Sequence, residues 1–314
     1  MTQIDVVTVV LVHWNQAARC VATVEAFRAQ EAVDVDMVIV DNGSSPDQLE
    51  VLHAIGAVTV IELGRNTGFG PGANAGWRHW LDGGKGEWCV VAPHDALPAP
   101  DCLSLMFDAL ESRPRAGLAC ADVGDGQTPV IDKYFGGMTL PARVEEGWEP
   151  AGYPHGTLLV ARRSCLGDIG LFDERYFAYC EEADLGERAR RAGWEVGIVR
   201  GARVVNPYLG GGSDIVDYLM LRNTLLLVRK HFGRYRATIR FLIALMHLVR
   251  GTIDPSNRPW IFAPAARVRA LADFGRGRFG PPPMSLTLGA TTPGRARSTR
   301  SSRTHAATRS TRPR

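Results

Sequence analysis

The chain has 314 residues, of which 45% are hydrophobic and 22% are charged, so its ordinary globular composition excludes a fibrous or wholly disordered protein. The formal net charge is +3, but residues 285–314 hold seven arginines and no acid, so the remaining body carries −4. Because a mildly acidic body lacks a broad basic surface, we expect no specific nucleic-acid partner.

The last segment, 284–314, is rich in Ser, Thr, Arg and Pro, and this composition predicts a disordered basic tail. The cysteines show neither C-x-x-C nor zinc-site spacing, which favours reduced core thiols; they are Cys20, Cys89, Cys102, Cys120, Cys165 and Cys180. No secretory signal is recognisable, and the apolar stretch Phe241–Val249 is shorter than the roughly 20 residues that span a bilayer. We therefore expect a cytoplasmic protein.

The first part of the chain alternates apolar runs with amphipathic segments. Strands are predicted at 6–12, 35–40, 58–63 and 87–92, and helices at 16–30, 46–55, 71–81 and 101–112. Strands that alternate with helices form right-handed βαβ units. The pattern therefore predicts an α/β fold with a mostly parallel sheet flanked by helices.

The second part is less regular. The segment 121–152 is rich in Gly, Asp and Pro, and we expect irregular structure around a site there. A strand is predicted at 155–162 and a charged helix at 181–192. Two helices with apolar faces follow at 217–231 and 236–250.

Each of the first four predicted strands is followed by a polar cluster. The clusters are His13-Trp14-Asn15, Asp41-Asn42-Gly43-Ser44, Arg65-Asn66-Thr67-Gly68-Phe69-Gly70 and Pro93-His94-Asp95. In an open α/β sheet the carboxyl ends of the strands lie at one edge, and ligands bind there. One such cluster is explained by a surface turn, but four in succession indicate a ligand site.

The residue types in these clusters suit a nucleotide and a cation. Asp41 can accept a hydrogen bond from the ring N–H of uracil or thymine, or it can simply cap a turn. Gly68 and its neighbours permit close backbone approach but do not form the G-x-G-x-x-G dinucleotide pattern. Asp95 offers hard oxygen ligands for Mg²⁺ or Mn²⁺, or it caps a helix.

An acidic cluster, Glu181-Glu182-Ala183-Asp184, opens the predicted helix at 181–192. The helix dipole favours an ionised Glu182, and an ionised carboxylate can remove a proton from an attacking hydroxyl. The alternative is an acidic first turn that only stabilises its helix.

In their order and spacing, these motifs resemble those of family 2 glycosyltransferases, especially bacterial rhamnosyltransferase-like members. The similarity covers residues 6–283. It rests on the clusters above and on Val40–Ser44, Asn66–Phe69, Asn74–Gly76, Gly170–Leu185, Arg191–Trp194, Arg222-Asn223 and Gly277–Pro282.

The resemblance implies a GT-A, Rossmann-like fold and an inverting transferase. Such an enzyme moves a sugar from a UDP- or dTDP-sugar to a hydroxyl of a glycan or lipid-linked acceptor, with Mg²⁺ or Mn²⁺, in cell-wall or surface glycan synthesis. Residues 1–210 would form the GT-A domain, with nucleotide-sugar binding in 1–120 and the acceptor and catalytic part in 121–210. A helical region would follow at 211–283.

The resemblance also implies roles for single residues. Glu182 stands where the family has its Asp base, with Glu181 and Asp184 beside it, and the cation is expected on Asp95 with Asn206. The residues expected to bind the nucleotide sugar are His13, Asn15, Asp41, Asn42, Asn66, Gly68, Phe69, Asn74, His94 and Asp95. Those expected on the acceptor side are His155, Gly156 and Arg222.

Departures from the family pattern leave two other functions open. Pro93-His94-Asp95 replaces Asn-Pro-Asp or Asp-x-Asp, Asn206 replaces a His, and Glu182 replaces an Asp. A non-catalytic relative that binds a glycan or a partner protein would also tolerate these changes. A sugar nucleotidyltransferase is disfavoured, because the basic Gly-rich loop that such enzymes carry after the first strand is missing.

Basic residues between 229 and 240 flank apolar helical faces. These faces either rest on an anionic bilayer, as a peripheral contact at the inner face of the cell membrane, or pack as ordinary amphipathic helices.

Overall fold

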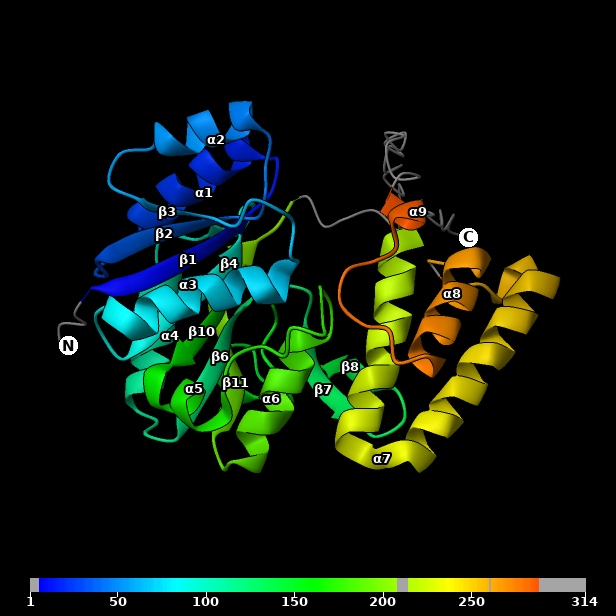
Figure 1. The fold of residues 1–314 in the computed structure, drawn as a ribbon. Helices are drawn as coiled ribbons and strands as arrows, with labels where there is room; N and C mark the ends of the chain where they lie inside the picture. The colour runs from blue at the N-terminus through cyan, green and yellow to red at the C-terminus, as the bar shows by residue number, and fades with distance from the viewer. Residues whose placement is uncertain (1–5, 208–213, 260, 288–314) are drawn as a thin grey trace, which may run out of the picture.

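Within the part of the chain that the structure describes, a nine-stranded sheet carries helices on both faces, and a group of long helices stands beside it (Figure 1). The computed structural model describes residues 6–207, 214–259 and 261–287. Of the predicted tail, the first residues form a short helix, α9 (Met284–Thr287), and 288–314 lie outside the described residues.

The first four strands run parallel in the spatial order β3-β2-β1-β4. They are β1 (Val7–His13), β2 (Val35–Asp41), β3 (Thr59–Glu62) and β4 (Trp88–Pro93). Val9, Val10 and Leu11 are fully buried, because β1 is covered on both faces, as its unbroken apolar run predicts. β2 and β3 extend the sheet on one side of β1, whereas β4 lies on the other side. The boundary between β1 and β4 is therefore the topological switch point, where ligands bind in such sheets.

The rest of the sheet mixes strand directions. β10 lies antiparallel between β4 and β6, and β11 runs parallel to β6. The additional strands are β5 (Leu97–Pro98), β6 (Ala116–Asp122), β9 (Gly147–Pro150), β10 (Leu159–Arg162) and β11 (Glu195–Val205).

The prediction of irregular structure at 121–152 is wrong for much of that segment. β7 (Gln127–Asp132) and β8 (Gly136–Pro141) pair as a separate hairpin, and β9 pairs with β11. Most of β8 is exposed, so it has no buried apolar run by which its strand could be recognised in the sequence.

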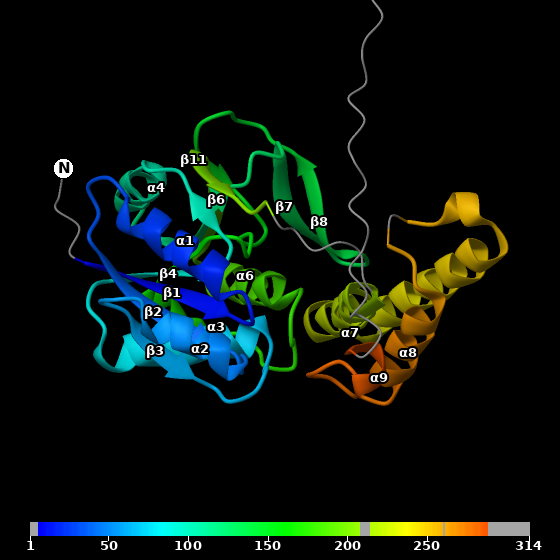
Figure 2. The ribbon, with the colours of Figure 1, turned by 90° about the horizontal axis from the view of Figure 1, so that it is seen from above.

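Helices cover the two faces of the sheet in two groups (Figures 1 and 2). One face packs against α1 (Ala17–Arg28), α2 (Pro46–His53) and α4 (Cys102–Glu111), and the other against α3 (Phe69–Gly83), α5 (Arg163–Ile169) and α6 (Glu181–Arg191). Helix α3 approaches β1 closely through Gly76, where an added Cβ would lie 2.2 Å from a methyl group of Val10.

The C-terminal helices have their own core. Helix α7 (Asp214–Ile253) breaks at Gly233, whose φ of 88° lies in the left-handed region, so that two arms form where the sequence predicts two helices. The short 3₁₀ helix η1 (Pro255–Asn257) follows, and α8 (Pro264–Gly275) packs along α7. Among the described helices, none is both long and apolar enough to cross a membrane.

Candidate active site

His13 and Asp41 end the neighbouring strands β1 and β2 and join them. Both side chains are at most 1% exposed, and His13 Nδ1 lies 3.0 Å from Asp41 Oδ1. The Gln16 N–H donates to His13 Nε2 at 3.1 Å, so we assign the proton to Nδ1, which donates to Asp41. Burial lowers the pKa of His13, which keeps its ring neutral.

Asp41 caps the turn that follows its strand. Its Oδ2 accepts hydrogen bonds from the N–H groups of Gly43 and Ser44, each at 3.0 Å. Burial alone would raise the pKa of Asp41, but the hydrogen bonds from Ser44 and His13 outweigh it and lower the pKa. Since a carboxylate has about four lone-pair sites, three hydrogen bonds leave about one for a ligand.

Asn42 fixes the loop that leads into α3. Its Nδ2 donates to the Gly68 carbonyl at 2.8 Å, and its Oδ1 accepts from the Thr67 N–H at 2.8 Å. Asn66 Oδ1 accepts from the Gly68 N–H at 3.0 Å. These two predicted nucleotide-binding side chains therefore shape the loop, and Asn15 does the same next to β1, where its Oδ1 accepts from the Ser45 N–H.

Gly68 can only be glycine in this position. Its φ is 98° and its ψ 172°, and a Cβ there would lie 2.0 Å from the Phe177 carbonyl oxygen. We expect Gly68→Ala to destabilise the fold by at least about 1–3 kcal/mol, the cost of a backbone region that is essentially restricted to glycine. Urea unfolding measures the change, and Gly83→Ala, at the open end of the same helix, is the control that should stay within about 1 kcal/mol. Equal losses in both variants would contradict the contact with Phe177.

Asn74 connects α3 to the segment that leads to the acidic cluster. Its side chain is 1% exposed, its Nδ2 donates to the Phe172 carbonyl at 2.9 Å, and its Oδ1 accepts from the Phe172 N–H at 2.9 Å. Phe69, one turn earlier, packs against the same core cluster as Phe172. Both predicted donor-binding residues thus hold the 172–181 segment against α3.

A strained turn precedes α6. Tyr179 and Cys180 have φ values of 69° and 73°, in the left-handed region that non-glycine residues rarely adopt. Asn223 of α7 donates from Nδ2 to the Ala178 and Tyr179 carbonyls at 2.8 and 2.9 Å. This asparagine therefore stabilises the backbone that aims the following two glutamates.

Arg222 lies behind Asn223 and does not face the site. It is 1% exposed, and its guanidinium donates to Asn223 Oδ1, the Tyr218 hydroxyl and the Gly280 carbonyl. The sequence motif contains both Arg222 and Asn223. In the structure, Asn223 contacts the turn before α6, and Arg222 orients the side chain of Asn223.

Glu181 and Glu182 begin α6 at the edge of the sheet where β1, β2 and β4 end. Glu182 Oε1 packs against Gly156, where an added Cβ would lie only 2.1 Å away. Gly156 precedes β10, whose first residue, Leu159, pairs with Val91 near the carboxyl end of β4. On the other side, Glu181 Cγ lies 3.6 Å from a Cβ built on Gly70 of α3.

Burial changes the protonation of this pair. It raises the pKa of Glu182 to about 7. Burial and the nearby Glu182 charge raise the pKa of Glu181 well above its ordinary value. Glu181 is 2% exposed, and its Oε2 has no hydrogen-bond partner in the described residues. Burial thus makes both carboxyl groups harder to ionise, and the pair keeps a proton more readily than two separate, solvated glutamates would.

Asp184 is buried away from the two glutamates in an ion-pair cluster. It accepts from Arg188 Nε at 2.9 Å, His231 Nε2 at 2.7 Å and Lys230 Nζ at 2.6 Å. Burial would raise the pKa of Asp184, but these partners, His231 first, hold it below the usual range. Asp184 thus ties α6 to α7, and with Arg188 it also forms an i,i+4 ion pair within α6.

Asp95 and Asn206, the two residues expected at the cation, lie together. Asn206 Nδ2 donates to Asp95 Oδ1 at 2.9 Å. Among the described residues, no cluster of three or more His, Cys, Asp or Glu side chains could hold a metal. One carboxylate and one amide suit a hard cation such as Mg²⁺, which keeps phosphate and water oxygens as its other ligands.

Two further predicted histidines line this edge. His94 Nδ1 lies 3.2 Å from the Val12 carbonyl, to which it donates, and its ring is 5.3 Å from that of His13. His155 Nδ1 lies 2.9 Å from the Thr157 hydroxyl. Burial lowers the pKa of both His94 and His155, so both rings are neutral walls of the site.

Comparisons with known proteins identify relatives of this chain. The sequence profile described as Glycosyl transferase family 2 matches residues 8–166. The N-acetylglucosaminyl-diphospho-decaprenol L-rhamnosyltransferase of Mycobacterium tuberculosis is 27% identical over 300 residues, which cover 81% of this chain and 96% of that protein. The succinoglycan biosynthesis protein ExoO of Rhizobium meliloti is 33% identical over 108 residues, 34% of this chain and 30% of that protein.

A solved structure shares the fold. The mannosyltransferase PcManGT from Pyrobaculum calidifontis, in complex with GDP-Man and Mn²⁺, superposes with a TM-score of 0.57 at 16% identity. The match covers 85% of this chain and 86% of that one. The GT-A-like α/β fold predicted from the sequence is thereby confirmed.

Proposed function

We propose a reaction for this chain from the premise that it belongs to glycosyl transferase family 2 and is a glycosyltransferase. The reaction transfers a sugar from a UDP- or dTDP-sugar to a hydroxyl of a lipid-linked glycan, with inversion at the anomeric carbon, in the synthesis of a cell-wall or surface glycan. One observation carries the proposal: Glu182 lies at the sheet edge at which Asp41 ends β2 and Asp95 follows the end of β4.

Glu182 is the proposed base. It takes the proton of the acceptor hydroxyl as that oxygen attacks the anomeric carbon, and the bond from this carbon to the donor diphosphate breaks. A single displacement inverts the configuration. A pKa of about 7 suits this role, since a base works best when its pKa is near the working pH. Of the two glutamates, Glu182 is the one whose carboxylate lies against Gly156, and Glu181 faces Gly70 of α3.

Asp95 and Asn206 would hold the divalent cation, Mg²⁺ or Mn²⁺. When bound, the cation supplies positive charge to the leaving diphosphate. On the donor side, Asp41 offers its remaining lone pair to the ring N–H of the base, and the neutral His13 keeps Asp41 in place. Gly156 stands beside Glu182, where the acceptor would enter, and His155 directly precedes it in the chain.

A donor screen tests the proposal. Purified protein with Mn²⁺ is offered a panel of UDP- and dTDP-sugars, and donor hydrolysis is measured. Calorimetry with UDP and dTDP, with and without Mn²⁺, accompanies it. We expect cation-dependent binding of one nucleotide and turnover of its sugar. Failure to bind either nucleotide would favour the non-catalytic partner. Formation of a nucleotide sugar and pyrophosphate from a sugar phosphate and a nucleoside triphosphate, tested in a separate assay, would favour the nucleotidyltransferase.

The acceptor is proposed to be a glycan on a lipid diphosphate. The relative with 27% identity over nearly its whole length is named for an N-acetylglucosaminyl-diphospho-decaprenol acceptor. An enzyme for such a substrate must work at a membrane surface. The second arm of α7, which follows Gly233, has side chains suited to that contact.

The outer face of this arm is apolar and exposed. Its residues recur with the helical spacing i, i+3, i+4, i+7 and i+11, and Leu242 and Ile253 are 57% and 78% exposed. We call these residues the outer face of α7: Leu242, Leu245, Met246, Val249 and Ile253. The arm lies at the margin of the molecule, away from the sheet (Figures 1 and 2). An apolar helix face of this kind can lie in the headgroup region of a bilayer.

The charge distribution supports an anionic bilayer as the occupant of this face. Residues 229–314 contain 18 Arg or Lys and two Asp, a formal charge of +16, whereas residues 1–228 carry −13, which together give +3. Basic residues near an apolar helix face add about 1 kcal/mol each to binding of anionic lipid.

We expect the double substitution Leu242→Glu/Val249→Glu to weaken binding to phosphatidylglycerol vesicles by at least about tenfold, because two buried apolar side chains are lost. Vesicle co-sedimentation measures it. Leu105→Glu, on an exposed leucine of α4, is the matched control and should bind like the unmodified chain. Unchanged vesicle binding, with a change from dimer to monomer in gel filtration, would assign the outer face of α7 to a second copy instead.

A further inference from the structure

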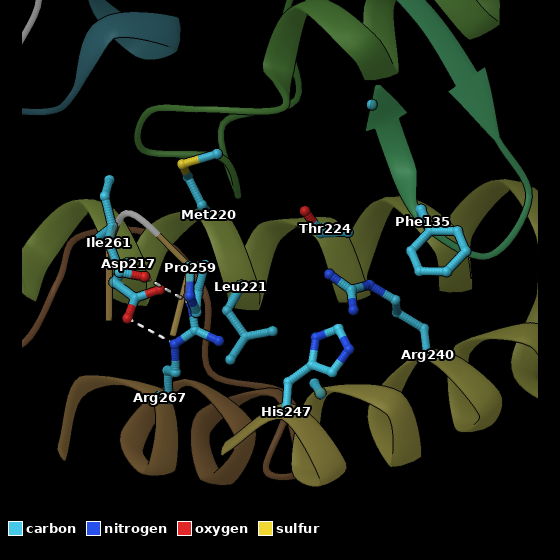
Figure 3. A pocket seen from close by; sticks show the side chains of 12 residues that line it. Phe135, Asp217, Met220, Leu221, Thr224, Arg240, His247, Pro259, Ile261 and Arg267 are labelled. Atoms are coloured by element: carbon cyan, nitrogen blue, oxygen red, sulfur yellow. Dashed lines mark hydrogen bonds and ion pairs between the residues drawn. The ribbon is translucent and has the colours of Figure 1, made fainter. Parts of the chain in front are cut away.

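A pocket lies among the C-terminal helices, apart from the strand ends (Figure 3). It has a volume of about 230 Å³ and lies between the two arms of α7, with the β7–β8 hairpin at one end and Pro259, Ile261 and Arg267 at the other. Its lining includes Phe135, Met220, Thr224, Arg240, His247 and Arg267.

The pocket holds positive charge that no acidic side chain of the described residues balances. Arg267 is neutralised by Asp217, whose Oδ2 accepts from its Nε at 2.7 Å. Arg240 is different: its Nε is buried without a hydrogen-bond partner in the described residues, and its guanidinium only lies over the Phe135 ring, 5.7 Å from the centroid. Figure 3 shows Arg240 and His247 both pointing inward from the second arm.

Positive charge without an acidic partner is costly where it is partly buried, and the pKa values of Arg240 and His247 reflect this. Burial, and then the charge of Arg267, lower the pKa of Arg240. Burial, and then the charge of Arg240, lower the pKa of His247. An anion between these groups would relieve both effects and would satisfy the free Arg240 donor.

The pocket adjoins the acidic pair. Thr224, in its wall, has its hydroxyl 3.7 Å from Cys180 Sγ, and Cys180 directly precedes Glu181 and Glu182. Gly137, also in the wall, lies against the Tyr153 hydroxyl, with 2.9 Å to an added Cβ. An anion bound in the pocket would therefore lie close to Glu181 and Glu182, on the side of the helices that carry the outer face of α7.

We propose that this pocket binds the diphosphate of the lipid-linked acceptor. The inference rests on the proposed function, because it takes the acceptor to be a sugar on a lipid diphosphate. Arg240 donates to the diphosphate, and the sugar that it carries extends past Thr224 to Glu182. The lipid chain leaves towards the bilayer on which the outer face of α7 lies.

Calorimetry on the full chain tests the site, with geranyl diphosphate and inorganic pyrophosphate as probes. EDTA is present, so that the cation-dependent donor site stays silent. We expect Arg240→Gln to weaken binding of both probes by at least about tenfold, the effect of losing a hydrogen bond to a charged group. Arg240→Lys should recover part of the affinity. Arg234→Gln, an exposed arginine of the same arm, is the control that should bind as the unmodified chain does.

Three results would overturn the assignment. The first is that the unmodified chain does not bind geranyl diphosphate. The second is that Arg240→Gln and Arg234→Gln bind it equally well. The third is that short-chain phosphatidylglycerol binds as tightly as geranyl diphosphate and competes with it. Thermal unfolding checks that each variant is folded. If Arg240→Gln does not fold, His247→Ala tests the same pocket. Donor hydrolysis is measured in parallel, so that an intact donor reaction with no diphosphate binding rejects the pocket but not the glycosyltransferase.

Discussion

The substitution Glu182→Gln is expected to lower kcat for sugar transfer by about 10²- to 10⁴-fold, the range that a positioned general base contributes. Glutamine keeps the shape of the side chain beside Gly156 but cannot take up the proton of the attacking hydroxyl. Donor binding should be unchanged, because Glu182 is proposed to act on the acceptor. Steady-state kinetics and calorimetry with the donor nucleotide measure the two effects.

Glu181→Gln is the matched control, since Glu181 is adjacent and buried but faces Gly70 of α3 instead of Gly156. Because Glu181 is not the proposed base, kcat should fall by less than about tenfold. Loss of activity in Glu181→Gln with normal turnover in Glu182→Gln would reverse the assignment of the base.

The pH profile gives an independent measure of the same residue. Burial raises the pKa of Glu182 from 4.5 to about 7, so the proton is bound below neutral pH and the base is lost as the pH falls through about 7. The value of kcat/KM, which reports the free enzyme, should therefore fall about tenfold per pH unit on the acid side. An acid limb near 4.5 would indicate a solvated carboxylate instead.

Asp95→Asn is expected to lower kcat/KM by about 10²- to 10³-fold, because a cation that meets leaving-group charge is worth several kcal/mol. Asp95 is the carboxylate of the proposed cation site, and Asn206 offers only an amide. The apparent Kd for Mn²⁺ in the presence of the donor nucleotide should rise with the loss of rate.

His94→Gln provides the comparison for Asp95. His94 hydrogen-bonds to the backbone of β1 and is proposed to line the site, so its removal should leave Mn²⁺ affinity within about threefold. If His94→Gln lost the cation and Asp95→Asn retained it, the cation would lie on the imidazole.

The sequence predicts the first half of the sheet well, because periodicity and burial agree there. β1 and β2 are apolar on both faces, and α3 has its glycines where it meets β1. The convergence of the strand-end clusters follows from the same parallel order. What each polar residue does within the site is less predictable: Asn42, Asn66 and Asn74 hold loops and segments, and only the structure shows their partners.

The second half is harder to predict, because long-range pairs stabilise it. β6 is composed mainly of small residues and carries no β-branched run. β11 contains Arg200, a residue untypical of a buried strand, whose charge is balanced by Glu149 at 2.8 Å and Asp122 at 3.3 Å. Asn223 reaches the strained turn before α6 across 44 residues of chain. No local pattern in the sequence indicates these contacts.

A crystal structure with Mn²⁺ and the preferred nucleoside diphosphate would show whether Asp41, Asp95 and Glu182 line one site. We expect the cation on Asp95, the base of the nucleotide next to Asp41, and the terminal phosphate directed towards Glu182 across an open space that fits one sugar. A nucleotide bound elsewhere on the molecule, or one whose terminal phosphate faces away from Glu182, would contradict this expectation.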